Sequence, residues 1–178
     1  MTHQVHTMTK PSSTVQHQTI ATPLGDVGLA ASHAGLVGVW FVGQAHAPQT
    51  QGWQEVSRSE AKRHPVLDLA HAQLTQYLAG ERQRFELPLA LPFGTPFQQR
   101  VWHALQTIAY GQTTHYGDIA QRVGSPNAVR AVGAAIGRNP LSMVIACHRV
   151  LGANGALTGY AGGIARKKSL LALEAAHA

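Results

Sequence analysis

The sequence predicts an α/β protein in which a small N-terminal α/β domain precedes a mostly helical domain with a helix-turn-helix. In the first half, short apolar and β-branched runs separated by turn residues precede one amphipathic helix. In the second half, two short helical patterns flank a glycine-containing turn. The charge is also divided: residues 1–93 carry six basic and six acidic residues, whereas residues 94–178 carry eight basic and two acidic ones. This segregation favours a polyanionic partner for the C-terminal half, usually nucleic acid, over a generically basic surface.

The expected organisation is a disordered tail over residues 1–17, an N-terminal domain over 18–90 and a C-terminal domain over 94–178. The tail lacks the apolar core of a signal peptide, and no apolar run approaches a membrane span, so we expect a cytoplasmic protein without membrane contact. The single cysteine excludes an internal disulfide and suits a reducing compartment. Three loosely spaced tail histidines are a weak metal signal and are interpreted as solvated: His3, His6 and His17.

The N-terminal elements follow from turn residues and periodicity. Residues 20–30 predict a β-hairpin that turns at Pro23–Asp26, and residues 36–42 predict another strand. A polar loop over 44–52 leads to a helix over 65–78, where apolar residues recur at helical spacing. Because no candidate site residue falls in this half, we assign it a supporting role.

The C-terminal domain is predicted to begin with a helix that runs to about Ile108, because Thr95 and Gln98 form a capping box and Pro96 occupies the first helical position. A short helix over 116–123 follows. After the turn at Gly124, Ser125-Pro126 is expected to cap a second helix over 127–137. Helix, turn and capped helix give the outline of a helix-turn-helix.

The second helix of this motif has a face suited to a groove. Val129, Val132 and Ile136 are predicted to face the core. The other face surrounds a long cation with small side chains, which would let the helix approach DNA closely: Asn127, Arg130, Ala131, Ala134 and Arg138. The helix N-terminus also favours a phosphate. From the residues alone, Arg130 is either a DNA contact or an ordinary solvated arginine.

The stretch from Met143 to Val150 predicts a buried strand that is interrupted by a thiol, an imidazole and a guanidinium. Cys147 alone would be interpreted as a small buried hydrophobe. The adjacent His148 and Arg149 favour a reactive thiol instead, because a thiolate needs a nearby base or positive charge. Successive strand side chains point to opposite faces, so His148 reaches the sulfur only if the strand ends or bends, or if a water bridges them.

Three features follow the cysteine. Asn154-Gly155 predicts a hairpin with a type I′ turn. The glycine-rich stretch over 158–163 can present backbone N–H groups to a ligand, or it is an ordinary flexible loop. A last helix opens at Arg166 and contains Glu174, which either pairs with a surface lysine or orients His148.

Residues 94–174 resemble the O6-alkylguanine-DNA alkyltransferases, also called methylated-DNA–protein-cysteine methyltransferases. The pieces that match jointly and in this order are Gly94-Thr95-Pro96-Phe97-Gln98, Val101-Trp102, Tyr110-Gly111, Arg130-Ala131-Val132-Gly133, Asn139-Pro140, Cys147-His148-Arg149-Val150, Gly159-Tyr160 with Gly162-Gly163, and Leu170-Leu171 with Glu174. Residues 1–93 match only in general character. The resemblance implies a ribonuclease H-like N-terminal domain and a winged helix-turn-helix C-terminal domain.

The resemblance also implies direct, single-turnover DNA repair. Cys147 would take the alkyl group irreversibly from O6-methylguanine, with O4-methylthymine left open as a further substrate. His148, acting through a water, and Glu174 behind it would deprotonate the thiol. Tyr116 would crowd the target phosphate and protonate or hydrogen-bond the guanine.

In this family the recognition helix sits in the minor groove and the damaged base is flipped into a pocket, as chemistry on a stacked base requires. Arg130 would fill the vacated place in the stack, and Asn139 would be the hinge between helix and active-site strand. The base edge would be read by the Val150 carbonyl and the Ala161 N–H, with Tyr160 lining the pocket. The implied partner is double-stranded DNA carrying O6-alkylguanine, bound by a monomer without cofactor, metal or protein partner.

Two residues depart from the family pattern. Ala146 stands where proline usually precedes the cysteine, which puts the rigidity of the pocket and the rate in question. His115 stands where serine is common, so a weaker helix cap is expected.

Three other functions fit the sequence less well. An alkyltransferase-like protein that flags lesions without repair would lack the acceptor cysteine. An alkylation-sensing DNA-binding regulator would need a further domain, for which the length leaves little room. A cysteine hydrolase would leave the basic helix-turn-helix unexplained.

Overall fold

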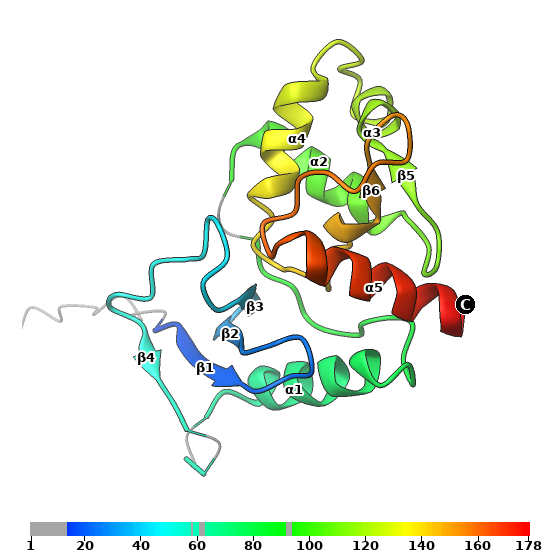
Figure 1. Cartoon of the computed structure of the whole chain (residues 1–178). Helices are drawn as coiled ribbons and strands as arrows, with labels where there is room; N and C mark the ends of the chain where they lie inside the picture. The colour runs from blue at the N-terminus through cyan, green and yellow to red at the C-terminus, as the bar shows by residue number, and fades with distance from the viewer. Residues whose placement is uncertain (1–13, 58, 61–62, 92–93) are drawn as a thin grey trace, which may run out of the picture.

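A computed structural model describes residues 14–57, 59–60, 63–91 and 94–178. It has an N-terminal part built on a sheet and a C-terminal part built on helices (Figure 1). The N-terminal elements are β1 (Gln16–Ile20), β2 (Val27–Ser32), β3 (Gly35–Phe41), β4 (Gln54–Glu55) and α1 (Pro65–Leu78). The C-terminal elements are α2 (Pro96–Gln106), β5 (Thr114–His115), α3 (Tyr116–Arg122), α4 (Val129–Gly137), a 3₁₀-helix (Cys147–Arg149), β6 (Val150–Leu151) and α5 (Ile164–His177). The predicted fold class is confirmed.

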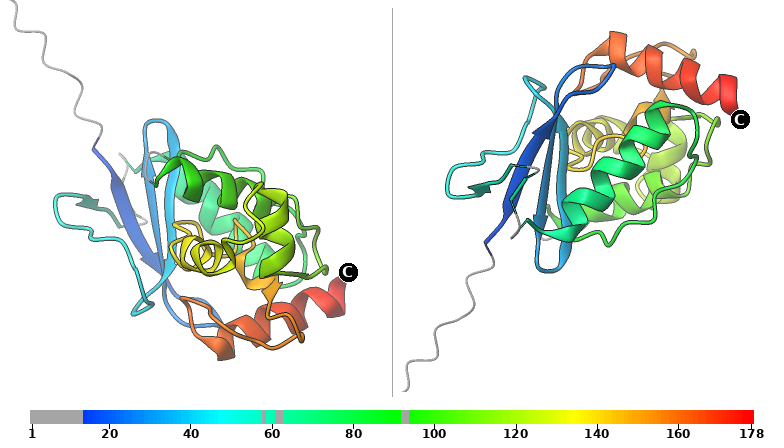
Figure 2. Two further views of the ribbon diagram at one scale, coloured as in Figure 1. Left: turned by 90° about the horizontal axis from the view of Figure 1, so that it is seen from above. Right: turned by 90° about the horizontal axis from the view of Figure 1, so that it is seen from below.

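The N-terminal sheet has the strand order β3-β2-β1-β4, with antiparallel pairs except for the parallel β1–β4 pair. α1 and the C-terminal helices lie on one face, and the segment between β3 and β4 lies on the other (Figure 2). The predicted hairpin is therefore present, but its first strand begins at Gln16, inside the expected tail. His17 is thus a strand residue, while His3 and His6 lie outside the described residues. β4 was not predicted, because two polar residues carry no strand pattern.

Local sequence fixes the starts of two helices. α1 has Pro65 at its first position and spans the predicted residues. α2 begins after Thr95, whose hydroxyl accepts from the Gln98 N–H at 3.3 Å, and the predicted capping box is present. α2 ends at Gln106, about half a turn before the expected Ile108.

Three predicted features of the C-terminal part are wrong. Residues 143–150 form turns and a 3₁₀-helix, and only Val150 and Leu151 are in a strand, paired in parallel with β5. At 154–155 only the glycine has a positive φ, whereas a type I′ turn needs two such residues. α4 starts at Val129 rather than 127 and has no side-chain cap, because the Ala128 N–H closes a turn onto the Ser125 carbonyl.

The outer edge of β3 joins the two parts of the chain. The Leu36 N–H donates to the Pro88 carbonyl at 2.7 Å, and the Ala90 N–H donates back to Leu36 at 2.9 Å. Further along the same edge, the Val39 N–H donates to the Pro140 carbonyl at 2.9 Å, and the Ser142 N–H donates to Val39 at 2.8 Å. The segment after α4 is therefore hydrogen-bonded to the N-terminal sheet just before the chain reaches Cys147.

One continuous apolar core also spans both parts. It includes Leu29 and Leu74 from the N-terminal part and Leu105, Ile145 and Leu170 from the C-terminal part. Such a shared core holds the segment around Cys147 against the sheet and α1. Among the described residues, no helix is long and apolar enough to cross a membrane.

Candidate active site

Two tight turns lead into Cys147. Met143 has a φ of 69°, in the left-handed region that non-glycine residues rarely adopt. Ala146 has φ −75° and ψ 57°, and the Cys147 N–H donates to the Ile145 carbonyl at 2.7 Å across it. These values define an inverse γ-turn. Because of this bend the chain does not continue as a strand from Cys147 to His148, so strand geometry does not force the two side chains onto opposite faces.

The Cys147 thiol is 4 % exposed and is held by the end of α4. The Asn139 amide nitrogen donates to the sulfur at 3.1 Å and to the Ile145 carbonyl at 2.8 Å. Burial raises the pKa of Cys147, while the Asn139 hydrogen bond and the Lys167 charge oppose that rise. The thiol is therefore protonated at neutral pH, so a nucleophilic sulfur requires a base that removes its proton.

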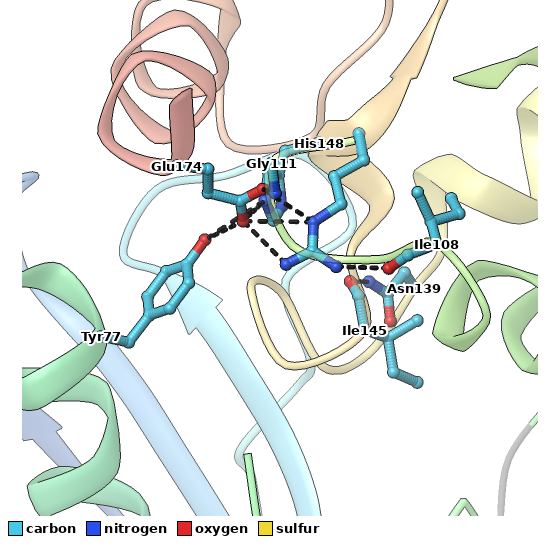
Figure 3. Close-up of polar contacts among 8 residues, drawn as sticks. Tyr77, Ile108, Gly111, Asn139, Ile145, His148 and Glu174 are labelled. Carbon is cyan, nitrogen blue, oxygen red and sulfur yellow. Dashed lines mark hydrogen bonds and ion pairs between the residues drawn. The ribbon is translucent and has the colours of Figure 1, made fainter. Parts of the chain in front are cut away.

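Glu174 is the centre of a buried polar network (Figure 3). One carboxylate oxygen lies 2.8 Å from His148 Nε2 and 2.8 Å from Arg149 Nη2, and the Tyr77 hydroxyl donates to it at 2.6 Å. The other accepts from Arg149 Nε at 2.8 Å and from the Gly111 N–H at 3.1 Å. Burial alone would raise the pKa of Glu174, but the hydrogen bonds from His148 and Arg149 outweigh it and hold the pKa well below its ordinary value.

His148 is fully buried, and its two ring nitrogens have different surroundings. Nε2 faces the ionised Glu174, which can only accept, so Nε2 carries a hydrogen. Burial lowers the pKa of His148 although Glu174 opposes this, so the ring is neutral at pH 7. The lone pair is therefore on Nδ1, which has no hydrogen-bond partner among the described residues. A neutral imidazole with this tautomer can accept a proton.

Lys167 is a second buried cation near the cysteine. Its ammonium donates to the Val150 carbonyl at 2.6 Å and to the Thr158 carbonyl at 2.7 Å. Burial lowers the pKa of Lys167, and the nearby Cys147 opposes the shift. The lysine thus joins the strand after the cysteine to the loop over 158–163 and adds positive charge beside the sulfur.

A groove of about 530 Å³ runs between α4 and the loop over 158–163. Tyr116, Arg130, Tyr160 and Ala161 line it, and so does His46 from the N-terminal part. The Tyr116 hydroxyl lies 3.1 Å from the carbonyls of both Thr158 and Gly159. The structure therefore brings four of the predicted site residues together around one groove that is open to solvent: Tyr116, Arg130, Tyr160 and Ala161.

The other selected residues lie around this groove. The side chains of Asn127, Arg130, Ala131 and Ala134 are all exposed, although Asn127 precedes α4 instead of belonging to it. Val129, which was predicted to face the core, is 40 % exposed, whereas Val132 and Ile136 are buried as predicted. The correction follows from the later helix start, since Val129 is the first residue of α4.

Two members of the site were not predicted. Tyr77 lies on α1, in the N-terminal half, to which the sequence assigns only a supporting role. Its position among the apolar residues at helical spacing indicates a core residue. Lys167 stands in a basic triplet that is typical of a solvated helix start, yet its side chain is fully buried. No local pattern could have selected Tyr77, because its partner Glu174 is 97 residues away. The described residues contain no group of three His, Cys, Asp or Glu side chains placed to hold a metal ion.

Comparison with known families agrees with this arrangement. Residues 15–91 match the family described as 6-O-methylguanine DNA methyltransferase, ribonuclease-like domain. Residues 96–176 match the 6-O-methylguanine DNA methyltransferase, DNA binding domain.

Curated relatives and solved structures extend this similarity to nearly the whole chain. The chain is 46% identical to a methylated-DNA–protein-cysteine methyltransferase of Mycolicibacterium paratuberculosis over 92% of this chain and 94% of the relative. It is 47% identical to the constitutive enzyme of that name from Bacillus subtilis, over 87% of this chain and 92% of the relative. The crystal structure of Mycobacterium tuberculosis OGT in complex with DNA superposes with a TM-score of 0.81 at 43% identity, covering 92% of this chain and 94% of that chain.

Proposed function

Because this chain belongs to the 6-O-methylguanine DNA methyltransferase family, we propose that Cys147 is the residue that accepts the alkyl group. The protein acts in direct DNA repair, by transfer of the methyl group of O6-methylguanine to a cysteine. Cys147 is the only cysteine in the sequence, so the acceptor assignment has no competitor. The observation that carries the proposal is that this buried thiol is followed directly by a neutral histidine, which an ionised glutamate holds through Nε2 and whose Nδ1 has no partner among the described residues.

The reaction balances with residues that line the site. The Cys147 sulfur forms a bond to the methyl carbon while the bond between that carbon and guanine O6 breaks. The thiol proton passes to His148 Nδ1 through a water, and the guanine ring takes up one proton at N1. Tyr116 is the donor we assign to that step, because burial raises its pKa and keeps its hydroxyl protonated until the guanine needs a proton. The resulting tyrosinate regains a proton from water, and the His148 imidazolium releases its extra proton to water, so both side chains end neutral. The thioether product has no easy return path, which makes the transfer single-turnover.

The groove beside α4 supports a role in holding an extruded base. Arg130 lies on an exposed helix face with small neighbours, as a residue that fills the gap in the base stack would require. The Ala161 N–H donates to no acceptor among the described residues and lines the same groove, so it is available to a base edge. The Val150 carbonyl keeps one lone pair for such a contact, since Lys167 occupies the other. Asn139 hydrogen-bonds the sulfur and directly follows the end of α4. A shift of this helix on binding DNA would therefore change the hydrogen bond to the thiol.

We further propose that the partner is double-stranded DNA carrying an O6-alkylguanine, bound by a monomer in the cytoplasm. The basic C-terminal half supports the choice of DNA, and the lone reactive thiol suits a reducing compartment. Size-exclusion chromatography with and without a lesion-containing duplex checks the monomer.

The direct test is peptide mass spectrometry after incubation with a duplex that contains one O6-methylguanine. We expect a single added methyl group on the peptide that contains Cys147, together with restored guanine in the DNA. A Cys147→Ser variant should still bind the duplex and should acquire no methyl group. An unmodified wild-type protein that still binds the lesion would overturn the proposal and favour a lesion-flagging function.

A further inference from the structure

The hydroxyl of Tyr77 is the contribution of the N-terminal part to the Glu174 network. It donates to Glu174 at 2.6 Å and lies 3.3 Å from His148 Nε2, while every other described partner of that carboxylate comes from the C-terminal part. The Tyr77 ring is fully buried, 5.1 Å from the Phe85 ring and 6.1 Å from the Tyr110 ring between centroids. In Figure 3 the tyrosine points from α1 directly at the carboxylate on α5.

The position of the hydroxyl favours one tautomer of His148. The Nε2 hydrogen lies between the Glu174 oxygen and the Tyr77 oxygen, both of which can accept it. Burial raises the pKa of Tyr77 strongly, so its own proton stays on the hydroxyl and is donated to Glu174. The tyrosine cannot be the base, and it leaves Nδ1 as the nitrogen that receives the thiol proton.

From this geometry we propose that Tyr77 is a positioning residue for alkyl transfer: by holding Glu174 and the Nε2 side of His148, it keeps Nδ1 as the base for Cys147. The inference rests on the proposed roles of Cys147 and His148. It gives the N-terminal part a direct function in the chemistry, transmitted through α1, in addition to support of the fold.

The charges around His148 determine what removal of the hydroxyl should do. The groups that face the imidazole are Tyr77 on α1, Glu174 and Lys167 on α5, and the neighbouring Arg149. In a Tyr77→Phe variant the carboxylate loses one donor, so more of its negative charge acts on His148 and stabilises the imidazolium. The pKa that governs the acid limb of the rate should therefore move to higher pH, and fewer molecules hold a neutral base at pH 7.

The test is the rate of methyl addition to the Cys147 peptide, measured as a function of pH with a lesion-containing duplex. For Tyr77→Phe we expect a rate constant about tenfold lower at neutral pH, the loss that corresponds to roughly 1.4 kcal/mol of transition-state stabilisation, and an acid limb shifted upward. Tyr110→Phe is the matched control, because its hydroxyl is buried in the same aromatic cluster and has no partner among the described residues. Its rate and pH profile should equal those of the wild type.

Each outcome has one meaning. A Tyr77→Phe profile that matches the wild type, or a rate that falls equally at all pH values without a shift, overturns the positioning role. A wild-type protein that gains no methyl group at Cys147 overturns the proposed function instead. If Tyr77→Phe does not fold, proton NMR of the wild-type Tyr77 hydroxyl decides: a slowly exchanging hydroxyl proton that is hydrogen-bonded to Glu174 supports the inference, and a freely exchanging one refutes it.

Discussion

Replacement of Ala146 by proline is expected to stabilise the protein by about 0.4–1 kcal/mol. Proline fixes φ near −65 ± 15°, and Ala146 already has a φ of −75° at the centre of an inverse γ-turn. The Ala146 N–H donates to no acceptor among the described residues, so its loss breaks no hydrogen bond. The substitution therefore acts by restricting the unfolded chain, while the folded backbone stays as it is.

Ala146 also lines a cavity of about 540 Å³ between the segment over 83–89 and the end of α2, so empty space adjoins the substituted residue. For a chain of this size, 1 kcal/mol shifts the melting temperature by about 2–4 °C, and we expect a rise of roughly 1–4 °C in a thermal unfolding experiment. Methyl transfer to Cys147 should be retained.

Ala134→Pro provides the matched control. It makes the same substitution at an exposed position inside α4, where proline removes a helical hydrogen bond and should cost about 3 kcal/mol or more. A melting temperature of Ala146→Pro that is unchanged or lower than that of the wild type would refute the reasoning. It would mean that the turn before the cysteine changes shape in solution.

The remaining predictions concern the buried charges and the DNA face. Glu174→Ala should lower the free energy of unfolding in urea by about 3–5 kcal/mol, because Arg149 and His148 lose their buried partner; a cost below about 1 kcal/mol would contradict the network. The pKa of His148 is lowered from its ordinary value of 6.5 by burial, so the unfolded chain binds more protons below that pH and the folded state loses stability as pH falls. Glu174, with its depressed pKa, adds a further loss below its ordinary value of 4.5. The free energy of unfolding in urea should therefore fall between about pH 8 and about pH 5, and it should depend less steeply on pH in a His148→Gln variant. Arg130→Ala should slow repair of duplex DNA more than reaction with free O6-alkylguanine; equal losses in the two assays would rule out the base-stack role.

Sequence patterns located the elements whose signals are local. Pro65 and the capping box at Thr95 fix helix starts through contacts within a few residues, and both starts are correct. The start of α4 was wrong because Ser125-Pro126 also suits a plain turn, which the structure adopts. The stretch from Met143 to Val150 predicted a strand, because its apolar residues include the β-branched pair Val144-Ile145. The structure forms two tight turns there instead.

The site shows the same division between local and distant information. His148 and Arg149 are adjacent to Cys147 in sequence, so they were selected at once. The sequence left two roles for Glu174, and the structure pairs it with His148 and Arg149. Tyr77 was not selected because its contact with α5 arises only when the sheet, α1 and the C-terminal helices share one core. Packing across the whole chain creates that contact, and no short window of residues encodes it.

The segment before the cysteine also protects the sheet from association with other molecules. An open edge strand is a template for pairing with another chain. At the β3 edge the described backbone is already paired with Pro88–Ala90 and Pro140–Ser142, and at the opposite edge β4 is only two residues long. Release of Pro140–Ser142 would therefore expose a hydrophobic strand and disturb the acceptor thiol in the same event. Aggregation and loss of reactivity should consequently share one trigger in this protein.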